Sequence, residues 1–420
     1  MATDHRLKSK MKRSDPNDFS IHDFLDECKT GDAADSRFDD SATSARNPRN
    51  TFVLGAPSLK VGNLYRLVSE KLAAERGWVQ RKDSDRFHFI IGGPRGSGIP
   101  FKRLAQLYKW DYGIVPHCNY IRGHIWITQK VKLLQVLRTA GLEALAPESF
   151  LFFPSTAEDN EADDFRAASE SSSKRATANK WIAKATDASR GERTLLSEDY
   201  DAIVSHIDAQ DKTSPAWIVQ RYITNPLLLP GGRKFDLRYF VLVDANMNFY
   251  ICPRPVLKVC ADKFSVDDLS NKLAHLSTAA VQGRQAEDYP AEQFTKWLAS
   301  EHGASYEATV LPSVRDAVSK VLEAARPKLE SADHADFTSF QIFAFDFILD
   351  DSLKLWFLEV CAPTDFPDHM VDELASDVVE LAVKPVFDSA RDARDAPTSG
   401  RAFQVLETTA SAPRSNNSKK

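Results

Sequence analysis

The stretch Phe343–Cys361 reads FAFDFILDDSLKLWFLEVC, two apolar runs separated by a polar turn, with one carboxylate inside each run. Aromatic and branched residues on both sides of Asp-Asp-Ser predict a β-hairpin. Pairing about this turn sets Asp346 nearly opposite Glu359, and cross-strand neighbours lie about 4.5–5.5 Å apart. Because two carboxylates this close repel each other strongly in an apolar setting, we expect a cation between them.

The carboxylate pair has two interpretations. A few hard oxygen ligands favour Mg²⁺, which keeps several waters and shares its coordination shell with substrate phosphates. Alternatively, the two charges lie on an edge strand and discourage aggregation. The hairpin alone does not decide between a metal site and a protected edge.

A second charged segment is a strand expected at Phe235–Val243 and the residues just before it. Strand alternation sends the apolar side chains to one face and Lys234, Asp236 and Arg238 to the other. Arginine can hold a phosphate or a carboxylate through two parallel hydrogen bonds, so this face suits binding of either group. A solvent-facing ladder of salt bridges is the alternative.

Two further segments invite a nucleotide interpretation. Lys184 closes the run Trp181-Ile182-Ala183-Lys184 and precedes a polar loop, which is typical of a phosphate-contacting lysine. The glycine-rich loop at residues 92–98 fails the P-loop pattern because Ile99 follows it where that pattern requires Lys and then Ser or Thr. We interpret this loop as a flexible turn.

Composition describes an ordinary globular chain. The 420 residues, 43% hydrophobic and 27% charged, are enough for two or three packed units, and no apolar run is long enough to span a membrane. The polar, basic start of the chain predicts no secretory signal. The five cysteines show no CxxC spacing, which argues against structural zinc and a disulfide framework. We therefore expect a cytoplasmic protein.

Charge is unevenly distributed although the net charge is only −5. Residues 51–150 carry 15 lysines and arginines against 7 aspartates and glutamates, which favours an acidic partner. Nucleic acid is the weakest interpretation, because no zinc, helix-turn-helix or RNA-binding pattern accompanies these charges. A solvated basic surface remains possible.

The expected organisation is a mixed α/β chain with polar ends. Tracts at 1–50 and 392–420 are predicted to be disordered, and Ser155–Asn179 is predicted to be a flexible insert or linker. Predicted helices cover Leu59–Glu75, Val131–Arg138, Ser313–Ala325 and Met370–Val383, and predicted strands cover Phe87–Ile91, Trp181–Lys184 and Trp217–Gln220. The expected domains are 51–117, 118–232 and 233–391.

In sequence order, these motifs resemble the ATP-grasp ligases and, more closely, the tubulin-tyrosine ligase family. The matching segments are WIAK at 181–184, VQRYITNPLLL at 219–229, RKFDLR at 233–238, and FAFDF at 343–347 with LEV at 358–360. RFHF at 86–89, IPFKRL at 99–104 and NYIRG at 119–123 are similar to the N-terminal domain of the member that adds tyrosine. The resemblance covers residues 51 to 390 and implies an ATP-grasp-like α/β (α+β) fold with a small N-terminal α/β domain.

The resemblance also implies a reaction. A monomeric, microtubule-associated enzyme would use ATP and Mg²⁺ to join free tyrosine to the C-terminal glutamate of α-tubulin through an acyl phosphate. The basic N-terminal region would face acidic tubulin. The implied site comprises phosphate contacts Lys130 and Lys184; an adenine segment Gln220, Arg221, Tyr222 and Ile223; strand residues Lys234 and Asp236; catalytic Arg238 and Lys258; and metal ligands Asp346 and Glu359.

Several positions depart from the family pattern. Cys361 stands where Asn is usual, and a thiol is a poor magnesium ligand. His-Leu-Ser-Thr at 275–278 replaces His-Leu-Thr-Asn, and Lys258 replaces an arginine, which loses the bidentate fork. Two alternatives therefore stay open: a ligase for glutamate or glycine, and a catalytically weakened tubulin-binding module.

Overall fold

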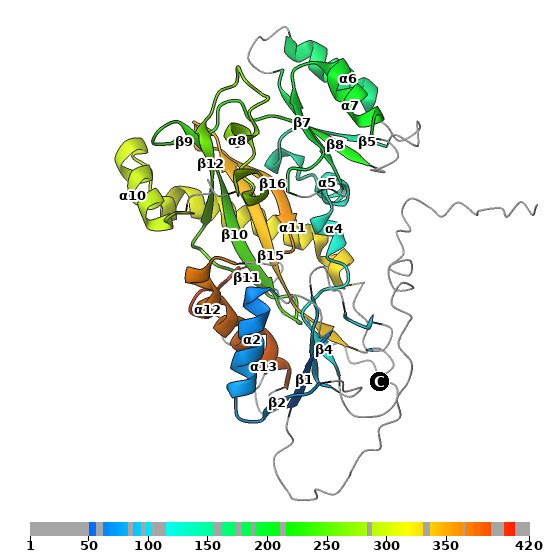
Figure 1. Cartoon of the computed structure of the whole chain (residues 1–420), viewed down its shortest axis with the longest axis vertical. Helices are drawn as coiled ribbons and strands as arrows, with labels where there is room; N and C mark the ends of the chain where they lie inside the picture. The colour runs from blue at the N-terminus through cyan, green and yellow to red at the C-terminus, as the bar shows by residue number, and fades with distance from the viewer. Residues whose placement is uncertain are drawn as a thin grey trace, which may run out of the picture. The chain divides into compact units, whose positions relative to one another are not determined.

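The computed structural model describes residues 50–55, 62–82, 87–93, 98–101, 104, 115–153, 161–173, 179–186, 188, 190–210, 216–283, 288–330, 337–363, 366–387 and 399–407. These residues form three β-sheets with helices packed against them (Figure 1). The predicted mixed α/β class is confirmed. The predicted domain boundaries stay a prediction.

The first sheet is parallel and has the order β14-β4-β3-β1-β2 within the described residues. Its strands are β1 (Asn50–Leu54), β2 (Trp78–Gln80), β3 (Phe89–Ile91), β4 (His117–Cys118) and β14 (Thr338–Ser339). The crossover helix α2 (Asn63–Ala74) buries Leu64, Val68 and Leu72, the one-face spacing of an amphipathic helix.

The second sheet is antiparallel with the order β5-β8-β6-β7. Its strands are β5 (Ser149–Phe152), β6 (Trp181–Ala185), β7 (Thr194–Ser197) and β8 (Trp217–Arg221). Helices α6 (Ala162–Ser173) and α7 (Tyr200–Asp208) lie side by side against it (Figure 1). Phe165 of α6 and Ile203 of α7 pack on the buried Trp181 and Trp217.

The third sheet is built on the long strand β10 (Arg233–Val243), which pairs with β9, β11, β12 and β15. The other strands are β9 (Leu228–Leu229), β11 (Phe249–Ile251), β12 (Val256–Lys263), β13 (Asp288–Tyr289), β15 (Gln341–Leu349), β16 (Leu355–Cys361) and β17 (Gln404–Val405). The hairpin predicted at 343–361 is confirmed as β15 and β16.

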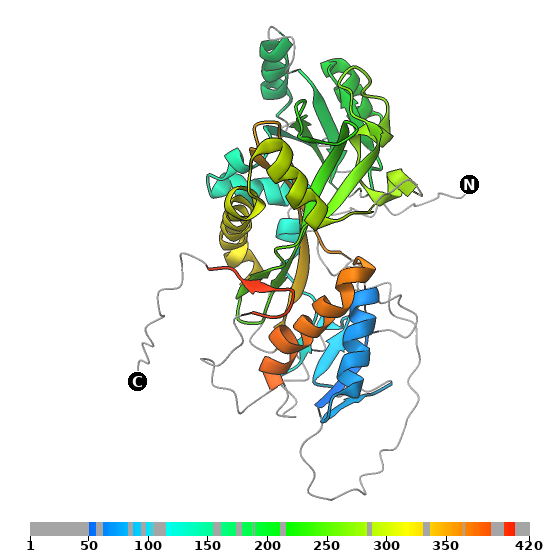
Figure 2. The same ribbon diagram turned by 90° about the vertical axis from the view of Figure 1, so that its left-hand side faces the viewer.

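Helices cover both faces of this sheet. One face packs on α4 (Ile125–Thr128), α5 (Lys130–Thr139), α10 (Ala291–His302), the π-helical turn Tyr306–Val310 and α11 (Leu311–Glu330). The other packs on α2, α12 (Asp368–Asp377) and the π-helical segment Val378–Val383, and Figure 2 shows α2 and α12 side by side. Short helices Glu143–Leu145, α8 (Lys272–His275), α9 (Ala279–Gln282) and α13 (Lys384–Phe387) complete the described elements.

Strand alternation in β10 explains how one strand serves both a core and a site. Phe235, Leu237, Tyr239 and Val241 face the first helical layer. The opposite face begins with the charged side chains and continues as Phe240 and Leu242, which α12 and its neighbours cover. The predicted two-faced strand is therefore confirmed, and its charged end lies just beyond the apolar cover.

The prediction of a flexible insert or linker at Ser155–Asn179 is wrong for residues 162–173, and the prediction of a disordered C-terminal tail is wrong for residues 399–407. The polar tract Ser155–Asn179 contains α6, whose Phe165 is fully buried between Phe150 and Trp181. In the predicted C-terminal tail, residues 399–407 pack on the fold, with β17 paired to β11 and Phe403 buried. In each segment one buried aromatic side chain, Phe165 or Phe403, holds the chain against the fold although the neighbouring residues are polar. Except for Asn50, the predicted tail 1–50 lies outside the described residues.

No helix among the described residues is long and apolar enough to cross a membrane. The predicted helices at 131–138 and 313–325 are confirmed by α5 and α11. The middle of the glycine-rich loop at 92–98 lies outside the described residues, so its interpretation as a turn stays a prediction.

The C-terminal segment is tied down by one carboxylate. Asp377 of α12 is 2% exposed and accepts hydrogen bonds from the backbone N–H groups of Arg401, Ala402 and Phe403. A Cβ at Gly400 would overlap the same carboxylate, so the close approach requires glycine.

We expect Asp377→Ala to lower the free energy of unfolding by about 1–3 kcal/mol, because three backbone donors lose their acceptor. Urea unfolding followed by circular dichroism measures this. Asp372→Ala on the same helix is the matched control, since its ion pair with Lys71 is exposed and contributes about 1 kcal/mol or less. Equal losses in the two variants would contradict the anchoring role.

Candidate active site

A row of charged residues crosses four adjacent strands of the third sheet. The strand registers pair Lys258 on β12 with Asp236 on β10, Arg238 on β10 with Asp346 on β15, and Asp346 with Glu359 on β16. The predicted opposition of Asp346 and Glu359 is confirmed. Strand pairing in the tertiary structure therefore brings Arg238 and Asp346, which are more than 100 residues apart in the sequence, next to each other.

Asp346 is the buried centre of this row, with a side chain 2% exposed. Arg238 donates two parallel hydrogen bonds to it, each 2.7 Å long, and the Lys258 ammonium lies 3.1 Å from Oδ2. Burial acts to raise the pKa of Asp346, but Arg238 and Lys258 outweigh burial and lower this pKa to about 2. The carboxylate is thus ionised throughout the physiological range.

Glu359 lies at the rim of the same cluster. Its Oε2 is 3.5 Å from the ammonium of Lys130, the first residue of α5. Burial and the neighbouring Asp346 act to raise the pKa of Glu359, while Lys130 and Lys184 act to lower it, and the net effect is a lowered pKa. The cation expected between the two carboxylates is supplied in part by the chain itself.

A β-bulge places Glu359 and the residues around it. Asp346 pairs with Glu359 but the next pair is Phe347 with Phe357, so Leu358 is an extra residue in β16. This extra residue sends Phe357 into the core although it is two positions from Glu359. Leu358 lines a pocket beside the charged row.

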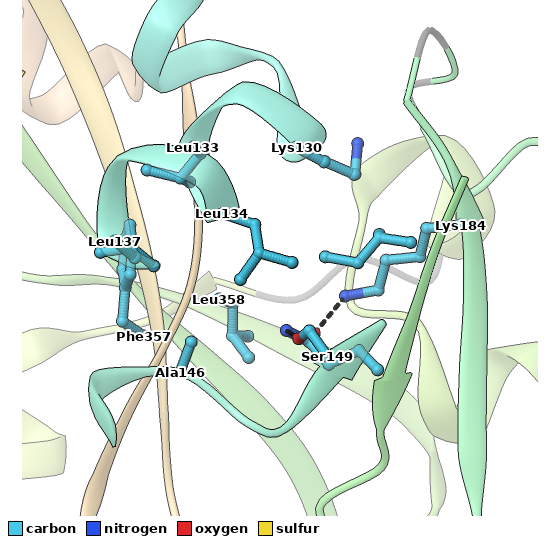
Figure 3. Close-up of a pocket in the computed structure, with 11 residues that line it drawn as sticks. Lys130, Leu133, Leu134, Leu137, Ala146, Ser149, Lys184, Phe357 and Leu358 are labelled. Carbon is cyan, nitrogen blue, oxygen red and sulfur yellow. Dashed lines mark hydrogen bonds between the residues drawn. The ribbon is translucent and has the colours of Figure 1, made fainter. Parts of the chain in front are cut away.

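That pocket lies between α5, the second sheet and β16 (Figure 3). Lys184 and Lys130 lie at its polar side, and Lys184 donates a 3.0 Å hydrogen bond to Gln220 Oε1. Gln220 in turn donates to the hydroxyl of Ser149. The remaining lining is apolar and comprises Leu133, Leu134, Leu137, Ala146, Ile218, Phe357 and Leu358. Apolar walls beside two ammonium groups suit a ligand that combines an apolar part with negative charge.

Burial lowers the pKa of Lys184 to about 8. The Glu359 carboxylate opposes this shift, and the Lys130 ammonium adds to it. A lysine with this pKa is still mostly charged at neutral pH but is poorly compensated by the chain, which favours an incoming anion.

The predicted strand residues form a buried network with α8 and the residues after it. Lys234 donates to Asp236 Oδ1 and to the backbone oxygen of His275, both at 3.1 Å. The Ser277 hydroxyl donates to the other oxygen of Asp236. The segment His275–Thr278 departs from the family pattern, but the Ser277 hydroxyl still contacts β10 through Asp236.

The predicted adenine segment is only partly gathered at the pocket. Gln220 lines it, whereas the Arg221 guanidinium lies 4.2 Å from the Trp181 ring centroid and binds Glu148. The Tyr222 hydroxyl bonds to His275, and Ile223 is half-buried. Any contact of Arg221 with a nucleotide would therefore use its main chain, and the assignments of this segment stay predictions.

Sequence reasoning missed Ser149 and the apolar lining of the pocket. The helical periodicity of 131–138 was detected, but periodicity does not say that Leu133, Leu134 and Leu137 border a pocket rather than a closed core. Ser149 lies next to Phe150 at the start of β5 and carries no motif.

The donor set fits Mg²⁺ through two carboxylates. Ligand atoms of Asp346, Glu359 and Cys361 lie within 4.8 Å of one another, and the Cys361 thiol is 3.6 Å from Glu359 Oε1. Burial raises the pKa of the Cys361 thiol, and sulfur is a soft ligand, so Cys361 does not complete a magnesium shell. Asp346 and Glu359 would hold the ion, with water and phosphate oxygens filling the other positions.

Comparison with known proteins gives matches that span most of this site. A sequence model of the tubulin-tyrosine ligase family matches residues 109–391. A protein monoglycylase of Mus musculus is 28% identical over 233 residues, which are 51% of this chain and 27% of that protein. Tubulin glycylase 3C of Tetrahymena thermophila is 23% identical over 236 residues, 51% of this chain and 21% of the relative. A probable tubulin polyglutamylase of Rattus norvegicus is 28% identical over 175 residues, which are 40% of this chain and 37% of that protein. The chain therefore spans well under half the length of these relatives.

We expect Asp346→Asn to lower the free energy of unfolding by about 3 kcal/mol, because it leaves two partly buried cations without their buried carboxylate. Glu359→Gln should cost less than about 1 kcal/mol, since the Glu359 side chain is 31% exposed and, among the described residues, only the Lys130 ammonium lies within ion-pair distance of it. Urea unfolding of both variants measures the difference. Equal stability of the two variants would show that Asp346 is not the centre of the cluster.

Proposed function

The chain belongs to the tubulin-tyrosine ligase family, as its motifs predicted, and we propose that it is an ATP-dependent ligase that joins an amino acid to a carboxyl group of tubulin. The row of opposed carboxylates and cations beside the apolar pocket is the observation that carries this proposal. Such a site can neutralise polyphosphate and an acidic acceptor at the same point.

The proposed chemistry is amide formation through an acyl phosphate. The acceptor carboxylate would take the γ-phosphoryl group of ATP, which releases ADP, and the amine would then attack the acyl phosphate and release phosphate; Mg²⁺ would supply charge neutralisation. Lys184 and Lys130 would contact phosphate at the pocket, and Asp346 and Glu359 would hold Mg²⁺. Arg238, already turned toward this centre by its bidentate pair, orients the acceptor carboxylate.

Lys258 and the pair Lys234–Asp236 have supporting roles in this proposal. Lys258 lies on β12, and its ammonium bonds to Asp346. It would add positive charge where the phosphates and the acceptor carboxylate bring negative charge together. Lys234 and Asp236 hold the floor of the nucleotide site through their buried network. Catalysis of this kind depends mostly on position and charge, because the protein supplies no covalent group.

We propose glycine or glutamate as the amino acid. The sequence interpretation favoured tyrosine, but the curated relatives bear the names of glycylases and a polyglutamylase. Tyrosine on the C-terminal glutamate of α-tubulin is the second candidate, favoured by the N-terminal motifs. We propose further that the protein acts on tubulin as a monomer. Its proposed location is the cytoplasm, in association with microtubules.

A weakened, tubulin-binding protein is the third candidate. Cys361 carries it, because the third position of the metal cluster offers a protonated thiol in place of an oxygen.

The proposed function is tested by incubating the protein with tubulin and Mg-ATP in the presence of labelled glycine, glutamate or tyrosine. We expect incorporation of glycine or glutamate, and a loss of more than about 100-fold in Glu359→Gln, beyond the loss typical of outer-shell metal partners. Glu301→Gln, an exposed change on α10, is the matched control and should keep full activity.

Incorporation of tyrosine alone would contradict the proposed amino acid and restore the second candidate. Binding of tubulin without incorporation of any amino acid would favour the weakened protein.

The pKa of Lys184 predicts a pH dependence of nucleotide binding. The charged form, which binds phosphate, is present below about pH 8 and is lost above it. Affinity for Mg-ATP should therefore be constant below this pH and fall by up to about tenfold per pH unit above it. Titration calorimetry between pH 6.5 and 9.5 measures this. Lys184→Arg stays charged and should lack the fall, whereas an unchanged fall in that variant would contradict the assignment.

A further inference from the structure

His275 is a fully buried polar residue that connects two sheets. Its side chain is 1% exposed and lies at the end of α8, between the second sheet and strand β10. Phe264 and Tyr222 pack against its ring at centroid distances of 5.3 and 5.5 Å. None of the reaction steps proposed above uses this imidazole.

The hydrogen bonds of His275 define its tautomer. Nε2 lies 2.8 Å from the backbone oxygen of Asp268, which can only accept, so Nε2 carries the proton. Nδ1 is then a bare acceptor, and it lies 2.8 Å from the Tyr222 hydroxyl, which donates to it. Both ring nitrogens are therefore satisfied by the neutral imidazole, in agreement with the lowering of its pKa by burial.

The backbone of the same residue reaches the third sheet. The His275 carbonyl oxygen accepts from the Lys234 ammonium, which also binds Asp236. Ser277, two residues on, donates to Asp236. Residues 275–277 thus contact Tyr222 at the end of β8 on one side and the charged face of β10 on the other.

We propose that His275 is a positioning residue that fixes Tyr222 relative to Lys234 and Asp236, and so sets the spacing between the predicted adenine segment and the charged face of β10. This inference rests on the proposed function for its kinetic consequence, but the connection itself is a property of the fold. In the neutral tautomer, Nε2–H donates to the Asp268 backbone oxygen and Nδ1 accepts from the Tyr222 hydroxyl. Rotation of the ring would therefore break both hydrogen bonds together.

Three substitutions separate the two ring nitrogens. Tyr222→Phe removes the donor to Nδ1. His275→Gln keeps a donor near the Nε2 position but removes the acceptor at Nδ1, and His275→Asn keeps an acceptor near Nδ1. His369→Asn, an exposed histidine on α12, is the matched control.

In the ligation assay we expect Tyr222→Phe and His275→Gln each to raise KM for ATP by about three- to tenfold, the loss of one buried hydrogen bond, with little change in kcat. The double variant should be no worse than either single variant, because both remove the same bond. His275→Asn should recover most of the affinity. Additive losses in the double variant, or equal losses in His275→Asn and His275→Gln, would overturn the proposal.

Hydrogen exchange of the protein without nucleotide tests the connection independently. Exchange at residues 217–223 and 234–237 should be faster in Tyr222→Phe and His275→Gln than in the wild type or His369→Asn, and unchanged in β15. If the wild type neither binds nor uses ATP, the proposed function fails, and this exchange pattern alone decides the positioning role. Unchanged exchange at both segments would overturn it.

Discussion

The bidentate ion pair between Arg238 and Asp346 is the interaction on which the site depends. It joins β10 to β15, and Lys258 adds a second cation to the same carboxylate. A buried charge without a partner would cost several kcal/mol, so neither strand could shift its register without that penalty. The pair therefore fixes the alignment from which Glu359, Asp236 and Lys258 take their places.

The site carries more positive charge than its own carboxylates neutralise. Asp346 and Glu359 face Lys130, Lys184, Arg238 and Lys258, and burial already lowers the pKa of Lys184. A phosphate chain and an acidic acceptor would supply the missing negative charge. Proteins tolerate such imbalance at functional sites because the ligand completes the electrostatics.

Connections between the sheets matter as much as the charged row. The segment 275–277 binds Tyr222 on one side and Lys234 and Asp236 on the other, and the bulge at Leu358 sends Glu359 to the site and Phe357 to the core. Departures from the family pattern sit at these same places: Ser277 keeps its hydroxyl contact with Asp236, whereas Cys361 offers a thiol beside Glu359. Ser277 thus contacts the site through its hydroxyl, and Cys361 offers sulfur where Mg²⁺ would favour oxygen.

Local sequence determined several of the elements and some of their partners. Alternation predicted the two faces of β10, and the turn at Asp-Asp-Ser predicted the opposition of Asp346 and Glu359, because both follow from short-range backbone geometry. Burial of Phe165 and Phe403 was not predictable from polar neighbours, since it depends on surfaces supplied by distant segments. The pairing of Arg238 with Asp346, the withdrawal of Arg221 onto Trp181 and the apolar pocket were likewise decided only by the tertiary structure. Periodicity assigns a side chain to a face of its own strand or helix, and only packing decides what that face meets.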